Sequence, residues 1–139
     1  MAATKTKSAK KKVKQKYPIV RLYLKANFNN SIITATDLAG KVIAWSSAGR
    51  AGFKGTKKST PFAAQKATED LLNQLKEFET NAVHLVIDGG GMGRDSFLRA
   101  VQASGLQIES IKDVTSFPFG GVRPKPRAEF NVKYLWQDI

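Results

Sequence analysis

Several residue types are scarce or absent in the 139-residue sequence, and each absence narrows what the protein can be. There is no cysteine, so disulfides and thiolate metal sites are excluded and a reducing compartment fits. No apolar run approaches the length of a membrane span, and the N-terminus lacks the apolar stretch of a secretory signal. The sequence therefore predicts a soluble intracellular protein.

Acidic residues are also few, and the positive charge that results is unevenly distributed. The chain has 23 Lys and Arg against 11 Asp and Glu, a formal net charge of +12 and a pI near 10.1. Seven lysines and no acid fall in residues 1–16, whereas residues 17–122 hold twelve cations and nine acids, a net charge of +3. Nucleic acid is the leading partner for such a charge, and an acidic membrane surface is the alternative.

The first 16 residues are low-complexity Lys, Ala, Thr and Ser. This composition buries too little apolar surface to offset its ordering entropy, so it predicts a disordered basic arm. We expect the arm, including Lys10, Lys11 and Lys12, to order on RNA; a solubilising segment without fixed contacts is the alternative. The arm lacks the apolar face that a membrane-surface helix needs.

The most informative stretch is residues 45–61, WSSAGRAGFKGTKKSTP, which combines four cations, three glycines and several hydroxyl groups with no acid. Glycines allow positive φ and bring backbone N–H groups close to a ligand, while Lys and Arg supply charge. Ser59, Thr60 and Pro61 predict a capped helix start, which presents unpaired N–H groups to an anion. Phe53 favours nucleic acid because its ring can stack on a base. A phosphate-binding surface is predicted, with a mobile, solvated connection as the alternative.

Residue patterns along the rest of the chain predict an α/β fold. Alternation and β-branched residues predict strands over residues 17–28, 31–36, 41–46, 82–87 and 106–112. The first strand has one face in the core, with Val20, Leu22, Leu24, Ala26 and Phe28. Apolar residues at steps of three and four predict a helix over 61–78, and a second helix follows the loop 88–96 and ends at Gly105.

These elements give a mixed sheet with a three-strand antiparallel meander and the order βββαβαβ. We expect the basic arm over 1–16, one RNA-binding domain over 17–112 and an extended tail, rich in proline and glycine, over 113–139. The strand over 82–87 is predicted to be covered on both faces. Because glycine-rich loops precede both helices, a repeated anion-binding layout is predicted.

The sequence offers little support for an enzyme. No glycine is followed directly by Lys and Ser or Thr, so no Walker A motif is present, and the dinucleotide-binding signal is weak. The strand order resembles the ribonuclease H-like arrangement, but metal nucleases need clustered carboxylates and the first strand has none. His84 is expected to be a packed or half-exposed strand residue, which leaves Ser59 and Ser96 without a base. We expect no catalytic residue, metal or cofactor.

Four blocks resemble the small-subunit ribosomal protein S-eleven family: KANFNNSIITATD (25–37), AWSSAGRAGFKGTKKSTPFAAQKA (44–67), GGGMGRDSFLRAV (89–101) and DVTSFPFGGVRPKP (113–126). The resemblance covers about residues 19–127. It implies a non-catalytic ribonuclease H-like core bound to small-subunit ribosomal RNA on the platform near the mRNA exit path, in translation. It also implies S-seven, S-eighteen and S-twenty-one proteins as neighbours, mRNA as a further contact and no membrane partner.

Carried onto this chain, the family resemblance implies a set of RNA-contacting residues: Arg50, Lys54, Lys57, Lys58, Ser59, Thr60, Arg94, Arg123, Lys125 and Arg127. Asn29 and Asn30 match a turn of the family, in which they are expected either to hold the turn or to face RNA. The implied location is a bacterial ribosome in the cytoplasm, with an organellar ribosome as the alternative. A generic basic RNA-binding protein and a ribonuclease H-like nuclease are the alternative functions.

The chain departs from the family pattern in three places. Gly90 and Met92 stand where the family's glycine loop usually has proline, and Asp88 stands where it has lysine, so weaker RNA contact is expected there. Residues 119–122, FGGV, replace the usual His-Asn-Gly-Cys and preclude isoaspartate formation. The chain continues through residues 128–139 where the family often ends in a basic cluster, and this extension is expected to pack on a protein neighbour.

Overall fold

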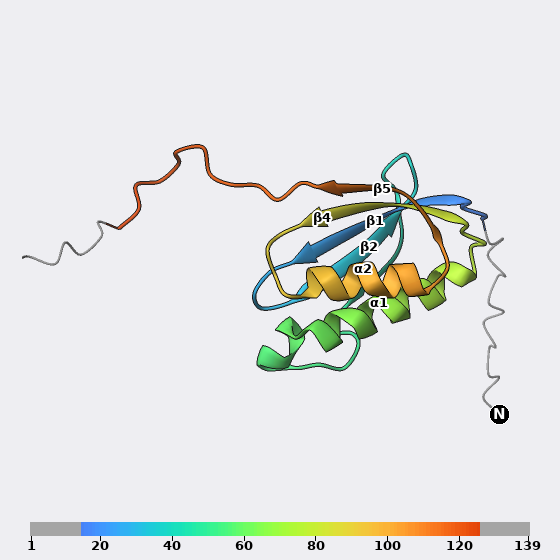
Figure 1. Cartoon of the computed structure of the whole chain (residues 1–139), viewed down its shortest axis with the longest axis horizontal. Coiled ribbons are helices and arrows are strands. Elements are labelled where there is room, and N and C mark those ends of the chain that lie inside the picture. The colour runs from blue at the N-terminus through green and yellow to red at the C-terminus, as the bar shows by residue number, and fades with distance from the viewer. Residues whose placement is uncertain (1–14, 126–139) are drawn as a thin grey trace, which may run out of the picture.

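The computed structural model describes residues 15–125, which form a mixed α/β domain with one five-stranded mixed sheet and two α-helices (Figure 1). The predicted mixed α/β fold is thereby confirmed. Along the chain the elements are β1 (Ile19–Ala26), β2 (Ser31–Thr36), β3 (Val42–Ser47), the 3-10 helix η1 (Gly55–Ser59), α1 (Pro61–Lys76), β4 (Ala82–Asp88), α2 (Gly93–Ala103) and β5 (Gln107–Asp113). Within residues 15–125, neither helix is long and apolar enough to cross a lipid bilayer.

The sheet has the strand order β3-β2-β1-β4-β5. The first three strands form an antiparallel meander, in which Leu24 lies opposite Ile33 and Ile33 opposite Ser46. β4 pairs in parallel with β1, and β5 in parallel with β4, each reached through a crossover helix. Every strand except β2 therefore runs in the same direction.

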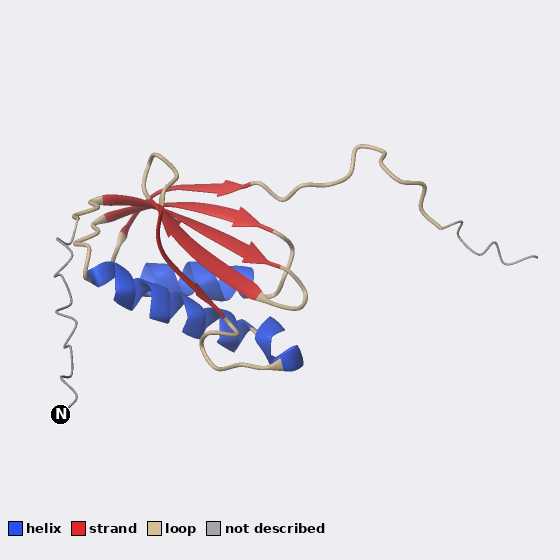
Figure 2. Ribbon diagram, turned by 180° about the vertical axis from the view of Figure 1, so that it is seen from behind, coloured by secondary structure: helices blue, strands red, loops and turns tan. Residues whose placement is uncertain are grey.

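Both helices cover the same face of the sheet, as Figures 1 and 2 show from opposite sides. α1 packs over β2 and β3 and lies beside α2. The core forms where the inward residues of the strands, such as Leu22 and Leu85, meet Leu71 and Leu75 of α1 and Phe97 of α2. Alternation along the strands and helical spacing along α1 thus place their apolar residues as predicted.

Three local predictions are wrong. Phe28 is 79% exposed because β1 ends at Ala26 and the chain turns, so Phe28 no longer follows the alternation. β4 is covered on one face only, since both helices lie on the same side and His84 and Val86 face away from them with partial exposure. The second helix begins at Gly93, so Ser96 lies within α2 instead of in the preceding loop.

Three alternate glycines, two in the loop after β4 and one at the start of α2, allow very close packing. A Cβ on Gly89 would lie 2.1 Å from the Ala26 carbonyl oxygen, and one on Gly91 would lie 2.4 Å from the Asn27 carbonyl oxygen. A Cβ on Gly93 would lie 2.5 Å from Ser31 Oγ. The loop is therefore fitted against the end of β1 and the start of β2, and the Gly91 N–H donates to the Ala26 carbonyl at 2.9 Å.

Replacing Gly91 with alanine tests this packing. The added methyl would meet only backbone atoms, Asn27 O at 2.4 Å and Ala26 C at 2.9 Å, so the loop or the end of β1 must shift. We expect Gly91→Ala to lower the free energy of unfolding by about 1–3 kcal/mol, as overpacking does. Urea unfolding followed by circular dichroism measures the change.

Gly90→Ala is the matched control, because a Cβ at Gly90 has nothing within 4 Å. It should leave the urea midpoint nearly unchanged or raise it slightly, since alanine restricts the unfolded chain. Equal destabilisation by both substitutions would contradict the packing role assigned to Gly91.

Candidate nucleic-acid interface

The loop after β3, which carries six of the thirteen predicted contact residues, lies at one edge of the sheet. The carboxyl ends of β1, β3, β4 and β5 meet there because these strands run in the same direction. Both helices start at this edge, and a Cβ on Gly93 at the start of α2 would lie 2.7 Å from the Ala64 Cβ of α1. We call this side of the domain the loop edge; in Figure 1 the arrowheads of β1, β4 and β5 point to it.

The segment 48–60, named the basic loop below, has a defined turn after β3. Ala51 N–H donates to the Ser47 carbonyl at 3.0 Å, and Phe53 N–H donates to the Ala48 carbonyl at 3.2 Å. Gly52 has a φ of +99°, a left-handed conformation that favours glycine. Ala48 is fully buried and its N–H donates to the Ser31 carbonyl, so the base of the loop is fixed to β2.

The cations of the basic loop fall into two kinds. Arg50 is held within the domain: its Nη1 donates to the Trp45 carbonyl at 3.1 Å, and its Nε lies 3.9 Å from Asp70 Oδ2. Within residues 15–125, no carboxylate lies within salt-bridge distance of Lys54, Lys57 or Lys58. These three lysines therefore form the unneutralised charge of the loop.

The hydroxyls of Ser59 and Thr60 shape the junction with α1. Thr60 caps α1, since its Oγ1 accepts from the Ala63 N–H at 3.3 Å, and Pro61 follows in the first turn, as predicted. Thr60 Oγ1 also donates to the Lys57 carbonyl at 2.7 Å, and Ser59 Oγ donates to the Thr56 carbonyl at 2.8 Å. The first turn of α1 contains no acidic residue, so its positive end faces the lysines without opposing charge.

The aromatic residues of the loop make contacts that the sequence does not reveal. Phe53 packs edge to face against Phe62, with ring centroids 5.8 Å apart. Phe62 is the more open ring, at 56% exposure, and Lys66 Nζ lies 5.6 Å from its centroid. A base that stacks on the predicted Phe53 would therefore also meet Phe62. The sequence could have indicated Phe62, because this residue lies off the apolar stripe of α1.

Arg94 and the glycine loop are used differently from the basic loop. Gly89, Gly91 and Gly93 pack against backbone and side chains of the domain, so their lack of a side chain serves packing. Arg94 Nη2 is hydrogen-bonded to Asp113 Oδ2 at the end of β5. Both loops precede a helix, as the predicted anion-binding layout requires. The cations without a carboxylate partner, however, belong to the basic loop and not to the glycine loop.

The turn between β1 and β2 is held by its own asparagines. Asn27 Oδ1 accepts from the Asn30 N–H at 2.7 Å and from the Asn29 N–H at 3.2 Å. Asn30 Oδ1 accepts from the Ser31 N–H at 2.9 Å, which gives Asn30 a structural part in the turn.

The remaining predicted contacts lie in the tail and the arm. Arg123 and Lys125 are exposed in residues 114–125, which contain no helix or strand and run away from the sheet (Figure 1). Arg127, Lys10, Lys11 and Lys12, the arm and the extension over 128–139 lie outside the described residues. The structure thus brings together the residues of the basic loop, and it sets Arg94 apart in an ion pair.

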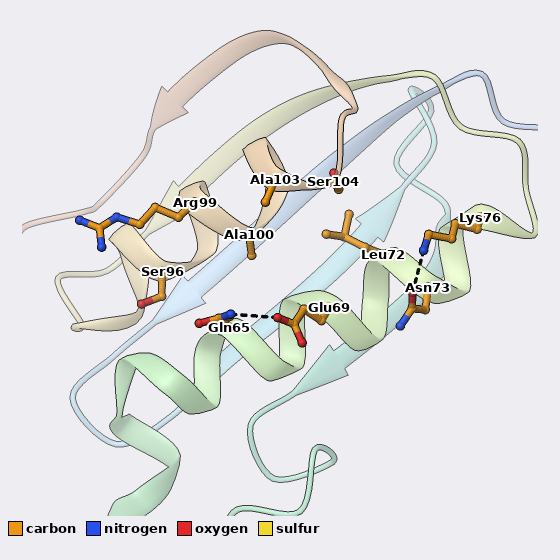
Figure 3. A pocket seen from close by; sticks show the side chains of 10 residues that line it. All are labelled: Gln65, Glu69, Leu72, Asn73, Lys76, Ser96, Arg99, Ala100, Ala103 and Ser104. Carbon is orange, nitrogen blue, oxygen red and sulfur yellow. Dashed lines mark hydrogen bonds between the residues drawn. The ribbon is translucent and has the colours of Figure 1, made fainter.

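A groove between the two helices lies away from the sheet, on the helical layer. It has a volume of about 700 Å³ and is lined by side chains of both helices, including Glu69 and Lys76 of α1 and Arg99 of α2 (Figure 3). Glu69 is engaged by Gln65 and Lys66, whose contacts lower the pKa of its carboxyl group, Lys66 contributing most. The groove contains none of the predicted contact residues.

The other titratable groups do not converge on one site. In the described part of the chain, no group of three or more His, Asp or Glu side chains could hold a metal ion. His84 is half-buried, with Nδ1 2.8 Å from Ser110 Oγ and Nε2 3.1 Å from Glu109 Oε2. The bulge between β4 and β5 brings both partners to His84, and sequence spacing did not predict them.

The fold and this edge define a basic α/β domain with an unneutralised lysine loop beside two helix starts. A sequence model of the family "Ribosomal protein S11" matches residues 20–129. The chain is 52% identical to the small ribosomal subunit protein uS11c of Cyanidium caldarium over 119 residues, 86% of this chain and 92% of that protein. It is 46% identical to the small ribosomal subunit protein uS11 of Borreliella burgdorferi (strain ZS7) over 125 residues, 90% of this chain and 96% of that protein. The chain therefore belongs to the ribosomal protein S11 family, and the resemblance found in the sequence is confirmed.

Thr115 and Arg94 together lower the pKa of the Asp113 carboxyl group at the end of β5. The Asp113 carboxylate accepts from the Thr115 hydroxyl, the Thr115 N–H and Arg94, in falling order of effect, and these contacts lower its pKa from 3.8 to about 2. Because the folded pKa is below the ordinary value, these contacts stabilise the fold above about pH 4, and their contribution is lost as the pH falls toward 2. Carbon-detected NMR titration of the Asp113 carboxyl should give a pKa near 2.

Two variants separate the causes of this shift. Thr115→Val, which removes the hydroxyl, and Arg94→Gln, which removes the charged partner, should each raise the pKa of Asp113. An unchanged pKa in Thr115→Val would contradict the assigned cause.

Proposed function

We propose that this chain is a structural component of the small ribosomal subunit and binds small-subunit ribosomal RNA through its loop edge. Its membership of the ribosomal protein S11 family supports the assignment, together with relatives named small ribosomal subunit proteins. In this proposal the folded domain sets the orientation, and the RNA fold is stabilised because the protein binds the folded form.

The observation that carries this proposal is the set of unpaired lysines beside two helix starts. Lys54, Lys57 and Lys58 lie in a loop whose ends are fixed by β3 and by the Thr60 cap of α1. Phosphates that approach this loop meet cations and the positive end of a helix dipole together. An ordered loop also loses less conformational entropy on binding than a mobile one.

Finer parts of the proposal follow from the family resemblance. The domain sits on the platform near the mRNA exit path, next to proteins of the S-seven, S-eighteen and S-twenty-one types. The arm over 1–16 and the tail over 113–139 add phosphate contacts, including those of Arg123, Lys125 and Arg127. The extension over 128–139 packs on a protein neighbour. A bacterial ribosome is the proposed location, with an organellar ribosome as the alternative, since relatives named uS11 and uS11c are similarly close.

The domain is proposed to be a ribonuclease H-like fold without catalysis. The sheet order, with β2 antiparallel to its neighbours, supports the fold. The carboxylates are arranged differently from those of a metal nuclease: Asp37 follows β2 at the edge opposite the loops, whereas Asp88 ends β4 at the loop edge. Asp113 is engaged by Arg94 and Thr115.

Charge removal from the basic loop tests the proposal. Binding of the full chain to a small-subunit platform RNA fragment and to an unrelated structured RNA is measured across a salt series. We expect tighter binding to the platform fragment that persists at moderate salt. Replacing Lys54, Lys57 and Lys58 together with alanine should weaken binding and reduce the slope of log affinity against log salt by about 2–3 units.

The control removes the same charge away from the loop edge. Lys41 follows the turn after β2 and Lys76 ends α1, so both lie far along the strands from the basic loop, and Arg99 lies on α2 in the groove that contains no predicted contact residue. Lys41→Ala, Lys76→Ala and Arg99→Ala together should change the slope by less than one unit. Equal effects of the two triple variants on the salt slope would exclude the basic loop as the main RNA contact. Equal affinity of the natural chain for both RNAs would indicate a generic basic RNA-binding protein.

A further inference from the structure

The face of the sheet that the helices leave uncovered carries large aromatic and apolar side chains. Both helices lie on the opposite face (Figures 1 and 2). Among the side chains on the open face, Trp45 of β3 is 49% exposed, Tyr23 of β1 is 37% exposed and Ile32 of β2 is 40% exposed. Aromatic groups left half-open on a sheet are a feature that packing within the domain does not explain.

The strand register places two of these rings in one row across the sheet. Trp45 lies opposite Thr34, Thr34 opposite Tyr23, Tyr23 opposite Val86, and Val86 opposite Lys112, so one line crosses all five strands: Trp45, Thr34, Tyr23, Val86 and Lys112. Trp45 and Tyr23 are two strands apart, a separation of about 10 Å. The short Thr34 side chain between them leaves room above the sheet.

Two hollows on this face are both lined by Tyr23. One, of about 420 Å³, is lined by Arg21 and Lys112 among others, and the other, of about 370 Å³, by Lys25 and Ile32 among others. Within residues 15–125, no carboxylate lies within salt-bridge distance of Arg21, Lys25 or Lys112. Each hollow thus combines an aromatic wall with an unpaired cation.

Trp45 is oriented by the basic loop. The Arg50 guanidinium carbon lies 5.0 Å from the centroid of the indole ring, and Arg50 is itself held by the Trp45 carbonyl and Asp70. Half of Trp45 stays exposed in spite of this contact. The indole is therefore preorganised next to the loop, which lowers the entropy cost of stacking a further planar group on it.

We propose that the open sheet face is a second RNA surface, on which unpaired bases stack on Trp45 and Tyr23 while the neighbouring cations contact their phosphates. This inference rests on the proposed function and adds single-stranded RNA as the class of ligand for this face. Charge favours RNA over a protein partner, because the three cations Arg21, Lys25 and Lys112 face only two carboxylates here. These are Asp88, which lines the second hollow, and Glu109, which lies 3.1 Å from His84. Continuity with the basic loop through Arg50 favours it further.

The test uses the full chain with Trp136→Phe, which leaves Trp45 as the only tryptophan. The probes are a short single-stranded oligoadenylate and an abasic strand with the same number of phosphates. We expect oligoadenylate to quench the Trp45 fluorescence and the abasic strand to leave it nearly unchanged. In the natural chain, Trp45→Leu and Tyr23→Leu should each weaken oligoadenylate binding by about tenfold without changing the salt slope.

Trp45→Phe is the matched variant, since it keeps a ring and should retain most of the affinity. Circular dichroism and urea unfolding check that each variant stays folded. The quenching measurement keeps the native Trp45, so it does not depend on how a substitution at Trp45 affects folding. Absent quenching, or unchanged oligoadenylate affinity in Trp45→Leu, would overturn the proposed stacking surface. The proposed function would still stand in that case if the variant of Lys54, Lys57 and Lys58 lost binding to the platform RNA fragment. Unchanged RNA affinity in Trp45→Leu with lost binding to a small-subunit protein would assign the face to a protein instead.

Discussion

The arrangement of the loop edge depends on the close approach of α2 to α1 and β2 at Gly93. A single methyl group there would lie 2.5 Å from Ser31 Oγ and 2.7 Å from Ala64 Cβ, so only glycine allows the two helix starts to lie side by side. Gly91 makes a similar approach to Asn27 at the end of β1. Because the start of α1 is fixed in this way, the lysines of the basic loop stand beside the positive end of a helix.

Local patterns predicted most of the fold, while contacts between distant residues could not be predicted. The alternation in β1, the stripe of α1 and the Thr60 cap each depend on neighbouring residues and were found as predicted. The glycines after β4 suggested an anion site from their composition, but their partners, Ala26 and Asn27, lie in the hairpin of β1 and β2, far away in the sequence. For the same reason, the sequence did not reveal the partner of Arg94 or the contact of Phe53 with Phe62, and it placed Phe28 in the core although the strand ends earlier.

Two surfaces with different physics meet at Trp45 and Arg50. The basic loop offers charge, which acts at long range and weakens with salt. The open sheet face offers aromatic rings, whose stacking depends on the bases and little on salt. Arg50 belongs to both, since its backbone lies in the loop and its guanidinium covers the Trp45 ring. A chain arranged in this way can hold a folded RNA by its phosphates and an unpaired segment by its bases.

The most direct test of RNA binding at the loop edge is a map of backbone amide NMR shifts over residues 15–125 when a small-subunit platform RNA fragment is added at moderate salt. We expect the shifts to concentrate at the loop edge, in the basic loop and the first turn of α1. They should spread to the open sheet face only when the RNA contains unpaired bases. Shifts concentrated at the opposite edge, around Asp37 to Lys41 and Glu79 to Asn81, would contradict RNA binding at the loop edge.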